Sequence, residues 1–180
     1  IDKKHLFLAC LSGNGELTFF LSHEKGLSLD LKNENDETPL HFACQSGSIR
    51  LVKYIIGAKK YDANYLNSRT KNGLSILNFA CRSKNLELVK YLFTLESLNK
   101  DLNILNQIKL LHEACQSGSR EIVKYLIEKQ KMETNIKIKD NMTILHLACK
   151  SGNCELVHYL LTSNFPIDPK AVNSENENIL

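Results

Sequence analysis

The stretch LHFACQSGSIRLVKYII, residues 40–56, returns almost unchanged as LHEACQSGSREIVKYLI at residues 111–127. Both copies contain an Ala-Cys pair, and this pair recurs throughout the chain of 180 residues. The alanines of the pairs are 34, 37, 34 and 34 residues apart, at Ala9, Ala43, Ala80, Ala114 and Ala148. A fixed period of this length is the signature of a repeat protein, so the same structural unit is expected about five times.

Two further columns follow the same period. A leucine lies three residues before each alanine: Leu6, Leu40, Leu77, Leu111 and Leu145. An aromatic residue lies eleven residues after each alanine: Phe20, Tyr54, Tyr91, Tyr125 and Tyr159. Because these columns stay in register in every copy, we expect them to mark equivalent helical positions.

Each copy predicts two short antiparallel helices joined by a tight turn. Thr38 is suited to cap the first helix, because its oxygen can accept a bond from a free N–H, and Pro39 at the first helical position loses none. Gly47 can end that helix in the left-handed conformation. The second helix carries apolar residues at helical spacing, for example Ile49, Val52, Ile55 and Ile56. A polar connection then leads to the next copy.

The pattern Thr38-Pro39-Leu40-His41, the turn glycine and the helix that follows resemble ankyrin repeats. The ankyrin period is about 33 residues and combines a β-turn with two helices. The resemblance covers the chain from about Asp2 to Leu180 and implies an all-α fold, an α-solenoid of stacked ankyrin repeats. The tetratricopeptide repeat, which has a Trp in its pattern, does not fit a chain without Trp.

We expect one ankyrin-repeat domain over residues 1–180. The repeats are expected at about 2–35, 36–72, 73–106, 107–140 and 141–175. Residues 176–180 are expected to begin a truncated sixth repeat, because Asn178-Ile179-Leu180 is in register with Thr143-Ile144-Leu145. The chain starts at Ile1 rather than Met, so we expect it to be an excised piece. The first copy lacks Thr, Pro and His, and is either an atypical terminal repeat or a diverged one.

The middle of the array is expected to be its weakest part. Lys84 stands where the other copies have a turn glycine, and a left-handed lysine costs roughly 1–2 kcal/mol. Lys109 stands where Thr should cap a helix, a loss of about 1 kcal/mol. Residues 59–72 also hold the three-residue insertion, in which Tyr61 and Tyr65 are expected to be exposed.

The cysteines and histidines predict structure rather than catalysis. Five of the six cysteines occupy the Ala-Cys column and no C-x-x-C occurs, so we expect buried, reduced thiols; Cys154 is also expected to pack. Reduced thiols indicate a cytoplasmic protein, with the nucleus as the alternative. The ankyrin resemblance implies that His41, His112 and His146 bond to the backbone near the hairpins. We therefore expect no catalytic residue, no cofactor and no metal ligand.

The charge and hydropathy patterns exclude two classes of partner. The net charge of +3 is spread along the chain and forms no basic stripe, so we expect no binding to nucleic acid. The longest apolar run, residues 6–11, is far shorter than the ~18 residues that span a membrane. The expected partners are other proteins. We expect a monomer, with end-to-end contacts through an exposed end face as the open alternative.

The resemblance implies that partners bind to the hairpin tips and inner helices of the concave face. The inner-helix candidates follow the cysteine column: Gln45, Arg82, Gln116 and Lys150. The tip candidates are Glu37, Lys71, Asn72, Leu74, Ile108, Lys139, Asp140 and Met142. Three of these, Leu74, Ile108 and Met142, predict an apolar ladder along the hairpin edge. Whether this ladder binds a partner or packs against neighbouring hairpins stays open.

These features predict a non-catalytic protein–protein interaction scaffold or adaptor. The alternative is a targeting or regulatory ankyrin module of a larger enzyme whose catalytic domain lies outside these residues. Both functions would give the same sequence features here. A small enzyme is a third alternative, but it would need one unique constellation of catalytic side chains rather than a copied scaffold.

Overall fold

The computed structural model describes residues 2–99, 103–135, 137 and 139–175. These residues form helices and connections with no strand, which confirms the all-α prediction. The chain contains two compact units, Ile1–Asp101 and Leu102–Leu180. The expected start of a sixth repeat at 176–180 lies outside the described residues.

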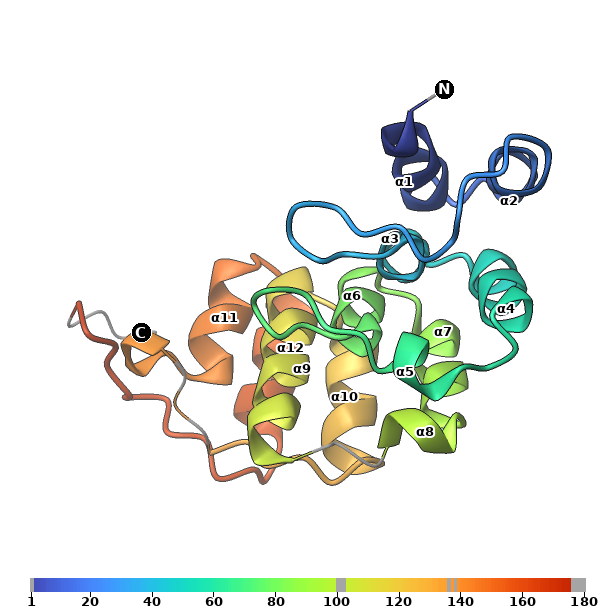
Figure 1. Ribbon diagram of the computed structural model, residues 1–180. Coiled ribbons are helices and arrows are strands. Elements are labelled where there is room, and N and C mark those ends of the chain that lie inside the picture. The colour runs from blue at the N-terminus through green and yellow to red at the C-terminus, as the bar shows by residue number, and fades with distance from the viewer. Residues whose placement is uncertain (1, 100–102, 136, 138, 176–180) are drawn as a thin grey trace. The chain divides into compact units, whose positions relative to one another are not determined.

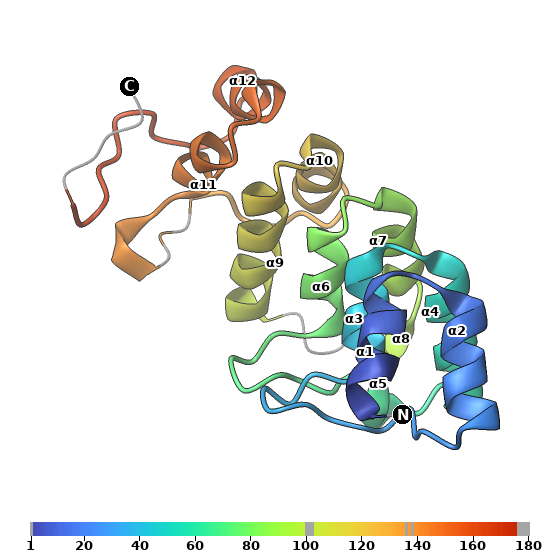
Figure 2. The same cartoon turned by 90° about the horizontal axis from the view of Figure 1, so that it is seen from above.

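Unit 1 contains three helix pairs. The first pair is α1 (Lys3–Leu11) with α2 (Gly15–Phe19), which continues into the π-helix η1 (Phe20–Glu24). The others are α3 (Pro39–Ser46) with α4 (Ile49–Ala58), and α6 (Ile76–Arg82) with α7 (Leu86–Phe93). The connections hold the short helices α5 (Ala63–Leu66) and α8 (Glu96–Asn99). Helices α1, α3 and α6 lie side by side in chain order, as Figures 1 and 2 show.

Unit 2 contains two helix pairs. The first is α9 (Ile104–Ser117) with α10 (Arg120–Glu128). The second is α11 (Ile144–Lys150) with α12 (Cys154–Thr162), preceded by the short 3₁₀ helix η2 (Lys139–Asn141). Helix α11 packs against α9, as α3 packs against α1 in unit 1.

The leucine column forms the core of every helix pair. All five leucines are buried, with no side chain more than 2% exposed. Four cysteines of the Ala-Cys column, Cys10, Cys44, Cys81 and Cys115, are also fully buried and free. Burial of each aliphatic side chain contributes roughly 1.5–3 kcal/mol, so the repeated columns supply much of the folding energy.

A reciprocal cap begins four of the described inner helices, α1, α3, α6 and α11. The backbone N–H of Thr38 donates to His41 Nδ1 at 3.1 Å, and Thr143 and His146 repeat the contact at 3.2 Å. In α6 the N–H of Ser75 donates to Asn78 Oδ1 at 2.9 Å. An asparagine therefore replaces the histidine without loss of the cap, because both residues offer an acceptor at the same position.

The turn inside each helix pair requires a left-handed residue. Gly47 has a φ of 77° and Gly118 a φ of 73°. Lys84 occupies the same position with a φ of 60°, which confirms that this lysine takes the left-handed conformation. The strain expected from a β-carbon there stays a prediction for the stability of the middle repeats.

Helix α9 departs from the expected repeat. It begins at Ile104, where Asn103 Oδ1 accepts from the N–H of Asn106 at 3.0 Å, rather than near residue 110. With Lys109 in place of a capping Thr and with no Gly or Pro at 104–109, nothing stops the helix from extending toward its N-terminus. The expected hairpin position of Ile108 is therefore wrong. His112 lies inside the helix instead of at a cap, which also contradicts the role implied for it.

Three further expectations about exposure are wrong. Tyr65 is buried, because Asp62 caps α5 and turns the ring inward, where its hydroxyl donates to Leu29 O at 2.8 Å. Cys149 is exposed because no described helix packs over that side of α11. Cys154 is exposed at the first position of α12. Tyr61 is exposed, as expected.

Candidate functional site

The inner-helix candidates of unit 1 lie in the last turns of α3 and α6. Gln45 and Arg82 directly follow the buried cysteines, and both are half-buried. The next residue fixes the turn in each case, because Ser46 Oγ donates to Ala43 O and Ser83 Oγ to Ala80 O, both at 2.7 Å. The Arg82 guanidinium lies 4.9 Å from the centre of the Phe79 ring. This stacking holds the charged group in one place beside the inner helices.

Backbone bonds connect the hairpin candidates of unit 1. The N–H of Lys71 donates to Asn35 O at 2.9 Å, which joins two successive connections into one edge. Glu37 accepts a bond from Asn33 Nδ2 at 2.6 Å and is half-buried. Lys71 and Asn72 are exposed.

Leu74 is half-buried, and its N–H donates to Thr70 Oγ1 at 3.1 Å. The hydrogen bonds of Leu74 and Glu37 therefore stabilise the connections in which these residues lie. Lys71 and Asn72 therefore offer more surface to a partner than Glu37 and Leu74 do.

The inner-helix candidates of unit 2 are more exposed than those of unit 1. Gln116 and Lys150 are exposed at the positions equivalent to Gln45 and Arg82. Asp140 is exposed with a φ of 61°, and Lys139 begins η2, although its side chain lies outside the described part of the chain.

The apolar ladder does not exist as expected. Met142 is half-buried and accepts a weak bond from Asn173 Nδ2 at 3.8 Å. Only Leu74 and Met142 directly precede capping residues, whereas Ile108 is half-buried within α9. Of the three residues, only Leu74 in unit 1 and Met142 in unit 2 thus keep the position expected for the ladder.

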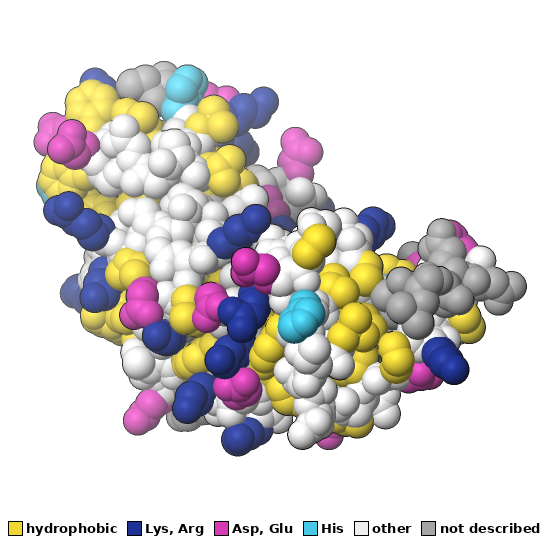
Figure 3. Space-filling model, turned by 180° about the vertical axis from the view of Figure 1, so that it is seen from behind, with side chains coloured by type: hydrophobic (Ala, Val, Ile, Leu, Met, Phe, Trp, Pro, Cys, Tyr) yellow, Lys and Arg dark blue, Asp and Glu magenta, His cyan; other side chains and the backbone are white. Residues whose placement is uncertain are grey.

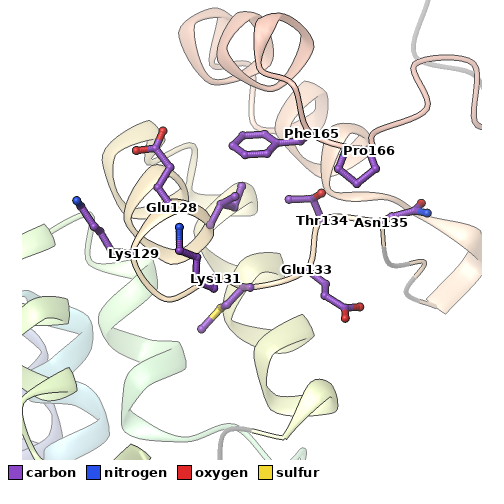
Figure 4. A pocket seen from close by; sticks show the side chains of 10 residues that line it. Glu128, Lys129, Lys131, Glu133, Thr134, Asn135, Phe165 and Pro166 are labelled. Atoms are coloured by element: carbon purple, nitrogen blue, oxygen red, sulfur yellow. The ribbon is translucent and has the colours of Figure 1, made fainter.

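A cavity of about 680 Å³ lies in unit 2, and the sequence analysis did not predict it. Its apolar lining includes Ile127 in α10 and Met132 after that helix. Phe165 and Pro166, which follow α12, complete this lining, as Figure 4 shows. The remaining lining residues are Glu128, Lys129, Lys131, Glu133, Thr134 and Asn135. Because the two connections belong to neighbouring repeats and follow no column, no sequence signal could have brought them together. An apolar lining with a mixed charged rim suits an apolar side chain of a partner.

Burial determines the chemistry of the titratable groups in the core. Burial raises the pKa of the Cys10 thiol to about 11 and that of Cys115 to about 12, and it also raises the pKa of Cys44. Burial lowers the pKa of His41 to about 4. At neutral pH these thiols are protonated, and protonated thiols are poor nucleophiles and poor metal ligands. Within the described residues, no three His, Cys, Asp or Glu side chains group to hold a metal ion.

The surface shows mixed charge. On the face drawn in Figure 3, lysine and arginine side chains lie among aspartates and glutamates instead of gathering in one basic patch. None of the helices described is both long and apolar enough to cross a lipid bilayer.

The helix pairs, left-handed turns and repeated caps define a helical-repeat protein. The family model described as ankyrin repeats (3 copies) matches residues 6–106 and 94–173, and the chain belongs to this family. Among solved structures, the chain is similar to the ankyrin repeat domain of human ASB11, with a TM-score of 0.70 and 19% sequence identity. That match covers 96% of this chain and 88% of the human domain and supports the solenoid fold. No curated protein matches the chain.

Proposed function

We propose that this chain is a non-catalytic adaptor or scaffold that binds a partner protein through the inner helices and hairpin edge of unit 1. Ankyrin repeats are generally protein–protein interaction modules. The observation that carries the proposal is the contrast between two adjacent columns. The cysteine column is constant and buried in unit 1, whereas the next residue differs between repeats and reaches the surface as Gln45 or Arg82. A constant core with a variable neighbouring surface is what a binding scaffold needs.

We place the main anchor at Arg82, supported by Lys71. Arginine is enriched at interface hot spots, and its stacking on Phe79 reduces the entropy that binding would otherwise cost. Lys71 lies on the connection that leads into α6, so its charge adds a second cation on the same repeat. These two groups favour a partner segment with acidic side chains.

The proposed compartment is the cytoplasm or nucleus. The buried cysteines support it, because free thiols persist in reducing compartments. The non-catalytic assignment is supported by the raised pKa values of the Cys10 and Cys115 thiols, which hold them in the unreactive protonated form.

The test is affinity capture with the intact protein, followed by binding measurements with the purified partner. The Arg82→Glu and Lys71→Glu variants should each weaken binding by about tenfold, a loss of about 1.4 kcal/mol. Arg50→Glu makes the same charge change at an exposed position on the outer helix α4 and should leave the affinity unchanged. Equal losses in all three variants, or none in any, would refute the assigned surface. Circular dichroism checks that each variant is folded.

A further inference from the structure

The cavity of about 680 Å³ in unit 2 is lined by the connections that follow α10 and α12. Its wall is apolar, because Ile127 and Met132 are 5% and 4% exposed and Phe165 of the second connection also lines it (Figure 4). The Phe165 ring makes an edge contact with the ring of Tyr159, with 5.9 Å between the two centres. Both connections belong to described repeats, so the cavity lies between two neighbouring repeats.

In unit 1 the corresponding connections close on each other. The short helices α5 and α8 lie there in contact, and Asn67 Nδ2 donates to Ser97 O at 3.0 Å. In unit 2 the connection after α10 forms no helix, and Lys131 within it is left-handed with a φ of 57°. Among the described residues, no bond of this kind joins the two connections of unit 2, and the cavity lies where they meet.

The charged residues at the cavity do not balance one another. The hydroxyl of Tyr159 donates to Glu128 Oε1 at 3.0 Å, which directs that carboxylate to α12. The Glu133 side chain points away from the cavity, whereas that of Lys131 extends toward it (Figure 4). Lys131 and Lys129 are both exposed, and neither forms an ion pair with any described carboxylate. The cavity therefore presents uncompensated positive charge beside an apolar wall.

We propose that this cavity binds a partner protein through a short segment in which an apolar side chain stands next to a carboxylate. The apolar side chain enters between Met132 and Phe165, and the carboxylate pairs with Lys131. Met132 suits this role, because its unbranched thioether adapts to apolar groups of different shape. Burial of the anchor supplies affinity, and the charge at the rim supplies selectivity. The site is built from unit 2 alone, so it adds to the binding surface of unit 1 and does not depend on it.

The two methionines of the chain provide a reporter and an internal reference. Met132 lines the cavity, whereas Met142 lies before α11, where Asn173 Nδ2 donates to its sulfur at 3.8 Å. With isotope-labelled methionine methyl groups, NMR gives one signal for each residue, and Met142→Leu identifies them. The probe is the peptide acetyl-Gly-Leu-Glu-Gly-amide, titrated at low salt. The Met132 signal should shift until the site is saturated, while the Met142 signal should stay in place.

Two altered peptides separate the two parts of the proposed ligand. Leu replaced by Gly removes the apolar anchor, and Glu replaced by Gln removes the charge, so each peptide should bind more weakly. Loss of the charge alone should cost about threefold to fivefold in affinity, as for an exposed ion pair, and this difference should vanish at high salt. A Gln peptide that binds as well as the Glu peptide at low salt would assign the cavity to a purely apolar ligand and overturn the proposal.

Lys131→Gln makes the matched change in the protein. It should weaken binding of the Glu peptide by the same factor and leave binding of the Gln peptide unchanged, because the ion pair needs both partners. Lys170→Gln removes an equal charge from an exposed residue of unit 2 that does not line the cavity, so it should affect neither peptide. Equal weakening in the two variants, a Met132 signal that does not respond, or a Met142 signal that shifts with it would each overturn the proposal. Circular dichroism checks that both variants are folded.

Discussion

The buried imidazole of His41 makes the stability of unit 1 depend on pH. Burial lowers the pKa of this side chain from 6.5 to about 4, and the backbone at Leu74 and Ser68 offsets only part of that shift. The ring is 0% exposed, and its Nδ1 accepts the N–H of Thr38, so the neutral form is the one that the helix cap requires. Protonation therefore opposes folding.

The sign and size of the effect follow from the two pKa values. Between pH 6.5 and pH 4 the unfolded chain binds a proton that the folded chain does not, so the free energy of unfolding falls as the pH falls. Each pKa unit corresponds to about 1.4 kcal/mol, which gives about 2 kcal/mol lost by pH 5 and about 3 kcal/mol by pH 4. Above pH 6.5 the contribution is fully present.

The matched variant is His41→Asn, because Asn78 makes the same cap one repeat later without a titrating ring. Urea unfolding followed by circular dichroism at pH 7 and pH 5 measures the free energy in each protein. The wild type should lose about 2 kcal/mol more than the variant on going to pH 5, since the other titrating groups cancel in the comparison. Equal losses in the two proteins would show that His41 is not the group responsible.

Three substitutions test the other structural assignments. Lys84→Gly should raise the free energy of unfolding in urea by about 0.5–1 kcal/mol, because the relief of left-handed strain exceeds the entropy that glycine adds to the unfolded chain. A lower free energy of unfolding would contradict the strain. Thr143→Ala should cost about 1 kcal/mol in thermal unfolding through loss of the cap, whereas Thr143→Ser should cost little; equal losses would exclude the hydroxyl as the cause. Leu74→Ser and Ile108→Ser should lower stability with unchanged partner affinity if these side chains only pack, and weakened affinity at full stability would instead assign them to the interface.

The sequence predicted the elements that every repeat shares. These elements are the leucine and cysteine columns, the left-handed turn and the capped inner helices. Each depends on residue types that recur at the same position in most repeats. Lys84 could be placed in the left-handed conformation from sequence alone, because its neighbours in register are glycines. The candidate residues on α3 and α6 could be placed on the helices for the same reason, while their role in binding stays a prediction.

The sequence could not predict features that depend on contacts between different connections. Tyr65 is buried because a short helix forms in the insertion, and this residue belongs to none of the columns that repeat along the chain. The cavity in unit 2 is lined by Met132 and Phe165, two residues outside every column. Cys149 belongs to a buried column yet is exposed, because burial of that column depends on the neighbouring repeat and not on the residue itself.

Helix α9 shows how one missing cap changes a binding surface. In α3 and α11 a threonine ends the hairpin and begins the helix, so the residue before it stays at the hairpin tip. At Lys109 no side-chain oxygen competes for the first N–H groups, and the helix extends back to the cap at Asn103. The hairpin edge that the proposed function assigns to partner binding is thereby replaced by helix at 104–109, and Ile108 is a helical residue rather than the tip residue that we expected. In unit 1 a backbone bond from the N–H of Lys71 to Asn35 O still connects successive hairpins, which is why the proposed function places the binding edge there.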